Sequence, residues 1–303
     1  MTNNAINIMP NWHHNWRNYW VLCKPKVVFL ILVTAIVGMV MAVETWQWST
    51  GITMIWATIG IGLAASSAAV VNHILDQRID AKMRRTEQRP LPQGNVSEQQ
   101  AAILAALLAL LSVIVLWTQT NVLTTVLTLL TLVGYAFVYT GYLKHATPQN
   151  IVIGGITGAA PPALGWVAIT GELHAHALLL VLIIFVWTPP HFWALAIARH
   201  DDYANAKVPM LPVTHGIHFT KWQIIFYTVL LVVVSVMPFV IGMSGLPYLM
   251  VALFLGAGYL YQVVRLLPDQ ENKTAMPAFG YSIWYLFILF IALTVDHLIA
   301  MPL

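Results

Sequence analysis

Nine apolar runs, each about as long as a membrane-spanning helix, dominate this sequence. A helix of about 20 apolar residues crosses the hydrocarbon core of a bilayer. Charged residues make up only 8% of the chain, whereas a soluble domain carries about 25%. The sequence therefore predicts an all-α polytopic membrane protein with nine transmembrane helices. The runs are Val27–Val43, Ile52–Leu75, Ala101–Trp117, Val122–Tyr142, Ile151–Thr170, Ala177–Ala198, Trp222–Met243, Tyr248–Val264 and Phe279–Ala300.

The basic residues are distributed unevenly over the connections between these runs. All fourteen Lys and Arg residues fall in the N-terminal segment 1–26 or in every second connection. Because basic residues gather in cytoplasmic loops, we expect residues 1–26 in the cytoplasm and the C-terminus outside a bacterial inner membrane. Topology thus explains the net charge of +3 without nucleic acid as a partner. No linker divides the runs, so we expect a single domain over residues 1–303.

The most informative string is NHILDQRIDAKMRRTEQRPLP, which ends the second apolar run. Asn72, Asp76 and Asp80 are four residues apart, so on a helix they share one face. Carboxylates at a membrane helix end are costly unless they pair or bind a cation, and Mg²⁺ prefers one or two of them plus phosphate oxygens. The basic residues that follow offer planar donors to phosphate; they are Arg84, Arg85 and Arg89. The string predicts a site for a magnesium-bound diphosphate.

A second polar tract, ARHDDYANAKVPMLP, follows the sixth run. It carries two acids, Asp201 and Asp202, and then Lys207, a candidate diphosphate ligand. The offset of four runs places both tracts on one membrane face and indicates two four-helix halves with a ninth helix added. Two acid pairs could then flank one diphosphate with a Mg²⁺ each, provided that the two connections meet.

His191 lies within an apolar run, directly after Pro189 and Pro190. A polar residue beside a kink in a membrane helix is a candidate functional residue, although a packed core histidine is equally compatible with the pattern. The glycines of GGITGAAPPALGW in the fifth run favour close helix packing. The single cysteine, Cys23, excludes an internal disulfide and a multi-cysteine metal site.

These motifs resemble those of a known family. The spacing from Asn72 to Asp80 is similar to the NxxxDxxxD motif of the UbiA-type intramembrane prenyltransferases. Four segments resemble more narrowly the haem-farnesylating branch of that family: KPKVVFL, MRRTEQRPLP, NIVIGGITGAAPPALGW and WTPPHFWALAIARHDDYANAKVPMLP. Members that use aromatic acceptors have spaced acids in the second motif. Here His191 stands near the first acid position, and Asp201 with Asp202 supplies the carboxylates.

The resemblance implies nine helices around a central cavity open to the cytoplasm. It implies transfer of the farnesyl group of farnesyl diphosphate to a vinyl group of haem B, with addition of water, release of diphosphate and formation of haem O. Mg²⁺ would be the cofactor, bound by Asp76, Asp80, Asp201 and Asp202, with Asn72 beside them. His191 would position the haem, which is a substrate. An association with haem A synthase or a terminal oxidase is a further expectation.

Two alternatives stay open on the sequence. One is a prenyltransferase for an aromatic acceptor such as a quinone precursor. The other is a polytopic transporter, because kinked helices with polar residues also suit transporters. The clustering of the acids at one membrane face, instead of the midplane, favours the enzyme.

Overall fold

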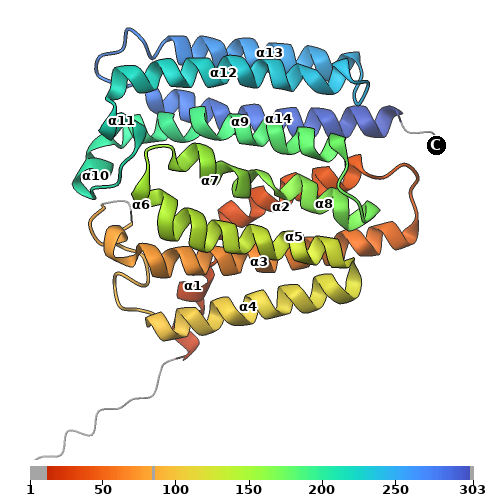
Figure 1. Cartoon of the computed structure of the whole chain (residues 1–303), viewed down its shortest axis with the longest axis horizontal. Helices are drawn as coiled ribbons and strands as arrows, with labels where there is room; N and C mark the ends of the chain where they lie inside the picture. Colours follow the sequence, from red (N-terminus) through yellow and green to blue (C-terminus); the bar gives the residue numbers. More distant parts are fainter. Residues whose placement is uncertain (1–11, 84–85, 301–303) are drawn as a thin grey trace, which may run out of the picture.

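The computed structural model describes residues 12–83 and 86–300, and this part of the chain folds into helices joined by turns, without a strand (Figure 1). The elements are α1 (Trp12–Leu22), α2 (Pro25–Met41), α3 (Trp48–Asp80), α4 (Glu98–Gln119), α5 (Val122–Val133), the π-helix η1 (Gly134–Leu143), α6 (Lys144–Ala146), α7 (Asn150–Ala159), α8 (Pro161–Thr170), α9 (Ala175–Ala198), α10 (His200–Asn205), α11 (Leu211–Thr214), α12 (Ile217–Val240), α13 (Leu246–Val264) and α14 (Ala275–Ala300).

The nine predicted runs coincide with the long helices. Eight helical stretches are long and apolar enough to cross a membrane; α5, η1 and α6 form one of them, and α7 with α8 forms another. A ninth span arises when residues 16–22 of α1 and the whole of α2, which meet at an angle of 49°, count as one. The all-α membrane fold is therefore confirmed for the described residues.

Helix α3 extends beyond the apolar run from which it was predicted. The second apolar run ends at Leu75, whereas α3 continues to Asp80, as the helical spacing of the motif predicted. Hydropathy marks where apolar residues stop, whereas a helix ends where its backbone hydrogen bonds stop. The whole motif from Asn72 to Asp80 therefore lies on a single helix of 33 residues.

The helices lie roughly side by side in a bundle, with α3, α4 and α5 on one side and α12 and α13 on the other (Figure 1). α3 packs against α4, α2 against α8, and α9 against α12 and α14. Buried clusters join α2 and α3 to α8, and α2 to α9 and α14, so the two predicted halves share their core.

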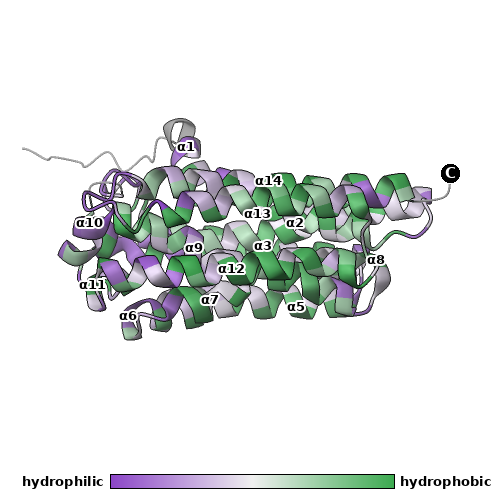
Figure 2. Cartoon of the chain, turned by 90° about the horizontal axis from the view of Figure 1, so that it is seen from above, coloured by the Kyte–Doolittle hydropathy of each residue, from purple (hydrophilic) through white to green (hydrophobic). Residues whose placement is uncertain are grey.

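Polar residues concentrate at the end of the bundle where α6, α10 and α11 lie, whereas the middle of the long helices is apolar (Figure 2). Large apolar side chains are exposed on the outer helices, among them Leu107 on α4, Val233 on α12 and Phe254 on α13. In water such a surface would be unfavourable, but in a bilayer it faces lipid chains. The exposed apolar surface thus agrees with a membrane-embedded bundle.

α2 and α8 touch at the level of their backbones. A Cβ atom added to Gly165 would lie 2.0 Å from the carbonyl oxygen of Ala35, and one added to Gly38 would lie 2.0 Å from that of Pro162. Only a residue without a side chain fits at either crossing point. The close packing predicted from the glycines of the fifth run is therefore confirmed.

We expect Gly165→Ala to lower the thermal stability of the protein in detergent micelles. The methyl group would force the two backbones apart, and overpacking of this kind costs about 1–3 kcal/mol. Gly158→Ala on the neighbouring helix is the matched control, because nothing lies within 4 Å of its added Cβ. Thermal unfolding of both variants should give a lower Tm for Gly165→Ala alone; equal midpoints would contradict the packing argument.

Candidate active site

The site is built on the last turns of α3. Asn72, Asp76 and Asp80 face the protein interior, with 5%, 2% and 3% of their surfaces exposed. A buried carboxylate stays charged only where cations or hydrogen-bond donors replace the lost water. The partners of these three side chains therefore show what the site is arranged to hold.

Each carboxylate has one cationic partner. The Lys144 Nζ atom donates to Asp76 Oδ2 at 2.7 Å, and the Arg89 Nη1 atom donates to Asp80 Oδ2 at 2.6 Å. The loop after α3 is tied back to the helix end, because the Thr86 hydroxyl donates to the Asp80 carbonyl oxygen at 2.9 Å. The two acids thus gather two positive charges from different segments at one place.

The amide of Asn72 links further segments to this cluster. Its Nδ2 atom donates to Asp76 Oδ2 at 2.8 Å and to the Thr140 hydroxyl at 3.2 Å, and its Oδ1 atom accepts from Lys24 Nζ. Thr140 lies in η1 and donates to the Tyr135 carbonyl oxygen, five residues back. π-Helical turns are rare and are frequently found at functional sites. The cluster therefore joins α3, η1 and the turn before α2.

Lys24 and Lys144 were assigned to membrane topology in the sequence, so their place in the cluster was missed. A signal existed, because Lys144 is the only Lys or Arg of its connection and lies two residues after the end of an apolar run. Lys24 directly precedes Pro25, and its backbone is left-handed with φ of 49°. That conformation is uncommon outside glycine and marks a position constrained by its surroundings.

Some polar atoms at the site have no hydrogen-bond partner among the described residues. They are Asp76 Oδ1 and both ring nitrogens of His73, all buried. His73 Nδ1 lies 4.0 Å from Asp80 Oδ2. A buried carboxylate oxygen left without a donor suits a metal ligand.

The donor set fits Mg²⁺ better than a transition metal. Across the described residues, no three His, Cys, Asp or Glu side chains gather closely enough to form a closed metal cage. Mg²⁺ takes one or two carboxylates and completes its shell with water and phosphate oxygens. Asp76 and Asp80, with the Asn72 amide beside them, are the side chains that could provide such a partial shell.

The acids of the second tract are placed differently. The Asp201 side chain is 96% exposed and pairs with His200 Nδ1 at 3.1 Å. Asp202 is half-buried, and Lys207 is exposed. These side chains thus have a more solvent-exposed environment than Asp76 and Asp80.

The two polar tracts nevertheless touch. Tyr203 of α10 packs in one buried cluster with Met83, which follows α3. The expectation that both tracts lie on the same face of the bundle therefore agrees with the structure, and apolar side chains make the contact. Arg84 and Arg85, predicted to bind diphosphate, lie outside the described residues.

His191 belongs to α9, and its buried side chain packs against α14. Its Nδ1 atom lies 2.6 Å from the Ser282 hydroxyl oxygen, and its ring stacks on Trp187 and Phe279 with centroids 4.1 and 4.5 Å away. Helix α9 continues through the proline pair, from Ala175 to Ala198. The hydrogen bond and ring contacts of His191 are with these two helices and not with the acids of α3.

Comparisons with known sequences give a consistent result. Residues 31–300 match the sequence model of the UbiA prenyltransferase family. A protein of Pseudoalteromonas atlantica named Protoheme IX farnesyltransferase 2 is 56% identical over 284 residues, which cover 93% of this chain and 92% of the relative. A protein of Nitrosococcus oceani named Protoheme IX farnesyltransferase is 55% identical over 284 residues, with 93% and 94% covered.

Solved structures share the fold at low sequence identity. A structure of digeranylgeranylglyceryl phosphate synthase has a TM-score of 0.74 and 17% identity, covering 94% of this chain and 99% of the other. An apo UbiA homolog from Aeropyrum pernix K1 has a TM-score of 0.72 and 19% identity, covering 90% and 98%. A UbiA homolog from Archaeoglobus fulgidus bound to GPP and Mg²⁺ has a TM-score of 0.65 and 14% identity, covering 91% and 99%.

The pair between Arg89 and Asp80 can be tested by stability. Because Asp80 is buried, Arg89→Leu should leave an uncompensated carboxylate and destabilise the protein by about 2–3 kcal/mol. Adding Asp80→Asn to Arg89→Leu should recover part of this loss, since the charge is removed together with its partner. Thermal unfolding of the four proteins of the cycle measures the coupling.

Arg265→Leu is the control for this cycle, because Arg265 is an exposed base at the end of α13. Strictly additive effects of the two substitutions at Arg89 and Asp80 would contradict the buried ion pair.

Proposed function

The chain belongs to the UbiA prenyltransferase family, and on that premise we propose that it transfers the farnesyl group of farnesyl diphosphate to a vinyl group of haem B. Water is added, diphosphate is released, and the product is haem O. The observation that carries the proposal is the buried cluster on α3, in which two carboxylates meet three cations. The acceptor rests on the relatives named protoheme IX farnesyltransferase at 55% and 56% identity.

The three cations account for the first chemical step. When the bond between the farnesyl C1 atom and the diphosphate oxygen breaks, the electron pair stays with diphosphate and its negative charge grows. We propose that Lys24, Lys144 and Arg89 stabilise that charge, because they gather around the α3 acids and fixed charges in a site shielded from water are effective in this role. We include Arg84, Arg85 and Lys207 among the proposed diphosphate ligands.

The acids and the amide of α3 would hold the metal. We propose Asp76 and Asp80 as the Mg²⁺ ligands, with Asn72 orienting Asp76. Bound Mg²⁺ would supply Lewis-acid stabilisation of the leaving diphosphate. Asp201 and Asp202 are proposed as a second set of metal ligands, and the buried cluster that contains both Tyr203 and Met83 supports this proposal.

The second step requires an apolar, positioned acceptor. The π electrons of the vinyl group form the new carbon–carbon bond with C1, and water then adds its oxygen to the remaining carbocation and loses a proton. A vinyl group is a weak nucleophile, so positioning supplies much of the rate. We propose that His191 positions the haem. The Ser282 contact at Nδ1 would hold the ring in place, and Nε2 would then be the nitrogen that meets the acceptor.

The two alternative functions, a transporter and a prenyltransferase for an aromatic acceptor, receive less support. The buried acids occupy the end of α3 and not the middle of a span, which argues against a transporter. The relatives named above argue against an aromatic acceptor. We further propose a bacterial inner-membrane location, a cytoplasmic N-terminus and a central cavity that opens to the cytoplasm. Association with haem A synthase or a terminal oxidase is part of the same proposal.

The metal ligands can be tested by activity. We expect Asp76→Asn and Asp80→Asn to reduce haem O formation at least about a thousandfold, because loss of a metal ligand removes several kcal/mol of transition-state stabilisation. Membranes containing each variant would be supplied with haem B, farnesyl diphosphate and Mg²⁺, and extracted haems analysed by mass spectrometry. Glu87 is an exposed acid in the loop after α3, and Glu87→Gln should retain activity. Near-normal activity of both aspartate variants would refute the assignment.

The role of His191 is tested by separating binding from transfer. His191→Ala should lose haem farnesylation and keep Mg²⁺-dependent binding of farnesyl diphosphate, because its contacts lie away from the α3 acids. Specific activity and Tm would be measured on the same purified variant. A lower Tm with unchanged activity per folded molecule would assign His191 to packing and remove it from the site.

A further inference from the structure

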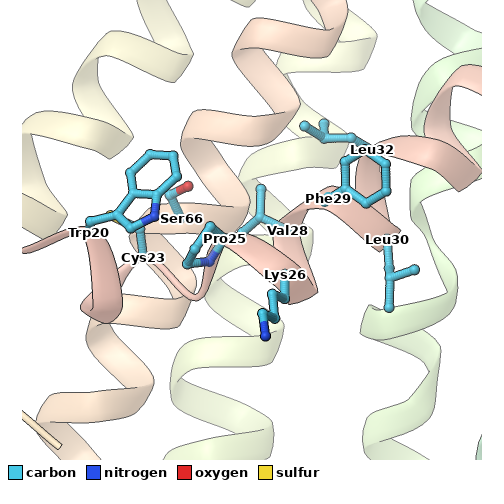
Figure 3. Close-up of a pocket in the computed structure, with 9 residues that line it drawn as sticks. All are labelled: Trp20, Cys23, Pro25, Lys26, Val28, Phe29, Leu30, Leu32 and Ser66. Atoms are coloured by element: carbon cyan, nitrogen blue, oxygen red, sulfur yellow. The ribbon is translucent and has the colours of Figure 1, made fainter. Parts of the chain in front are cut away.

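A groove with a volume of about 650 Å³ lies where α1 meets α2, beside α3 (Figure 3). It is lined mostly by apolar side chains, with one base and one hydroxyl: Trp20, Cys23, Pro25, Lys26, Val28, Phe29, Leu30, Leu32 and Ser66. The groove is separate from the acid cluster, because Lys24, which lies between two of its lining residues, turns to Asn72 instead. A space of this size and lining suits an apolar chain.

The N-terminal segment that forms most of this groove carries bases and no acid. Residues 1–43 contain Arg17, Lys24 and Lys26 but no acid, and the first acid of the chain is Glu44. Lys26 is exposed and forms no ion pair with any residue that the structure describes. The groove therefore presents a free positive charge.

The residues around the groove indicate that it lies at the headgroup level of the membrane. Trp16 and Trp20 of α1 are 60% and 59% exposed, and the Arg17 guanidinium lies 5.7 Å from the centre of the Trp16 ring. Exposed tryptophans beside bases are typical of the headgroup level of a bilayer. Lys26 and Leu30, four residues apart, lie on one side of α2 (Figure 3). With the helical rise per residue, Leu30 lies about 6 Å further along the helix axis than Lys26.

We propose that this groove binds one anionic phospholipid, with its phosphate at Lys26 and an acyl chain along Phe29, Leu30 and Leu32. A single exposed cation matches the single negative charge of a phosphodiester. A prenyl diphosphate carries more charge and matches the three cations of the α3 cluster. The lining therefore selects a membrane lipid and not the substrate of the proposed reaction.

Cys23 gives a direct probe, because it lines the groove and is the only cysteine of the chain. Full-length protein in detergent micelles would be treated with N-ethylmaleimide, and the alkylation rate would be followed by intact mass. We expect phosphatidylglycerol to slow alkylation at least about threefold at a concentration above its dissociation constant. Phosphatidylcholine and farnesyl diphosphate should leave the rate unchanged.

Substitutions identify the charge responsible. Lys26→Gln should abolish the protection by phosphatidylglycerol and leave farnesyl transfer intact. Arg265→Gln, an exposed base at the end of another helix, should keep that protection. Native mass spectrometry provides a second measurement, in which wild-type protein should retain one more phosphatidylglycerol than Lys26→Gln does.

Several outcomes would overturn the proposal. They are equal protection by phosphatidylglycerol and phosphatidylcholine, protection by farnesyl diphosphate, and equal retention of phosphatidylglycerol by the wild-type protein and Lys26→Gln. Loss of activity in the α3 variants tests the proposed reaction separately, because those variants keep the groove.

Discussion

The polar end of this protein depends on the compensation of two buried carboxylates. Asp76 and Asp80 lie inside a membrane protein, where a charge without a partner costs several kcal/mol. The cations that offset them come from the segment after η1 and from the loop after α3. Segments distant in sequence must therefore meet at the end of α3 before that helix end can be buried at low cost.

Close helix packing supports this arrangement from the apolar side. The backbone contact between α2 and α8 fixes α2 within the bundle, and α2 also packs against α3. Lys24 immediately precedes α2 and reaches Asn72 on α3. Glycines buried in the bundle and charges at its end thus act on the same helices, and we infer that changes at the crossing point would also disturb the cluster.

The membrane architecture could be read from the sequence because it depends on local composition. A run of apolar residues from Ala177 to Ala198 predicts a spanning helix wherever it occurs, and α9 covers that range. The spacing of Asn72, Asp76 and Asp80 likewise predicted one shared face, since helical periodicity is also local. The apolar run stops at Leu75, before the end of α3, because the last turns of this helix are polar; the spacing of the acids, and not hydropathy, predicted that the helix continues.

The partners of the acids could not be read in the same way. Lys144 pairs with Asp76 across 68 residues, and Lys24 contacts Asn72 across 48. Such contacts depend on which helices pack together, and composition does not determine helix packing. The surroundings of His191 also required the structure, because Ser282 and Phe279 come from α14. The sequence by itself determined the spans and the face of α3 that carries the acids, because both follow from periodicity and apolar length. Only the tertiary structure decided which cations compensate those acids, because compensation is a matter of distance in space.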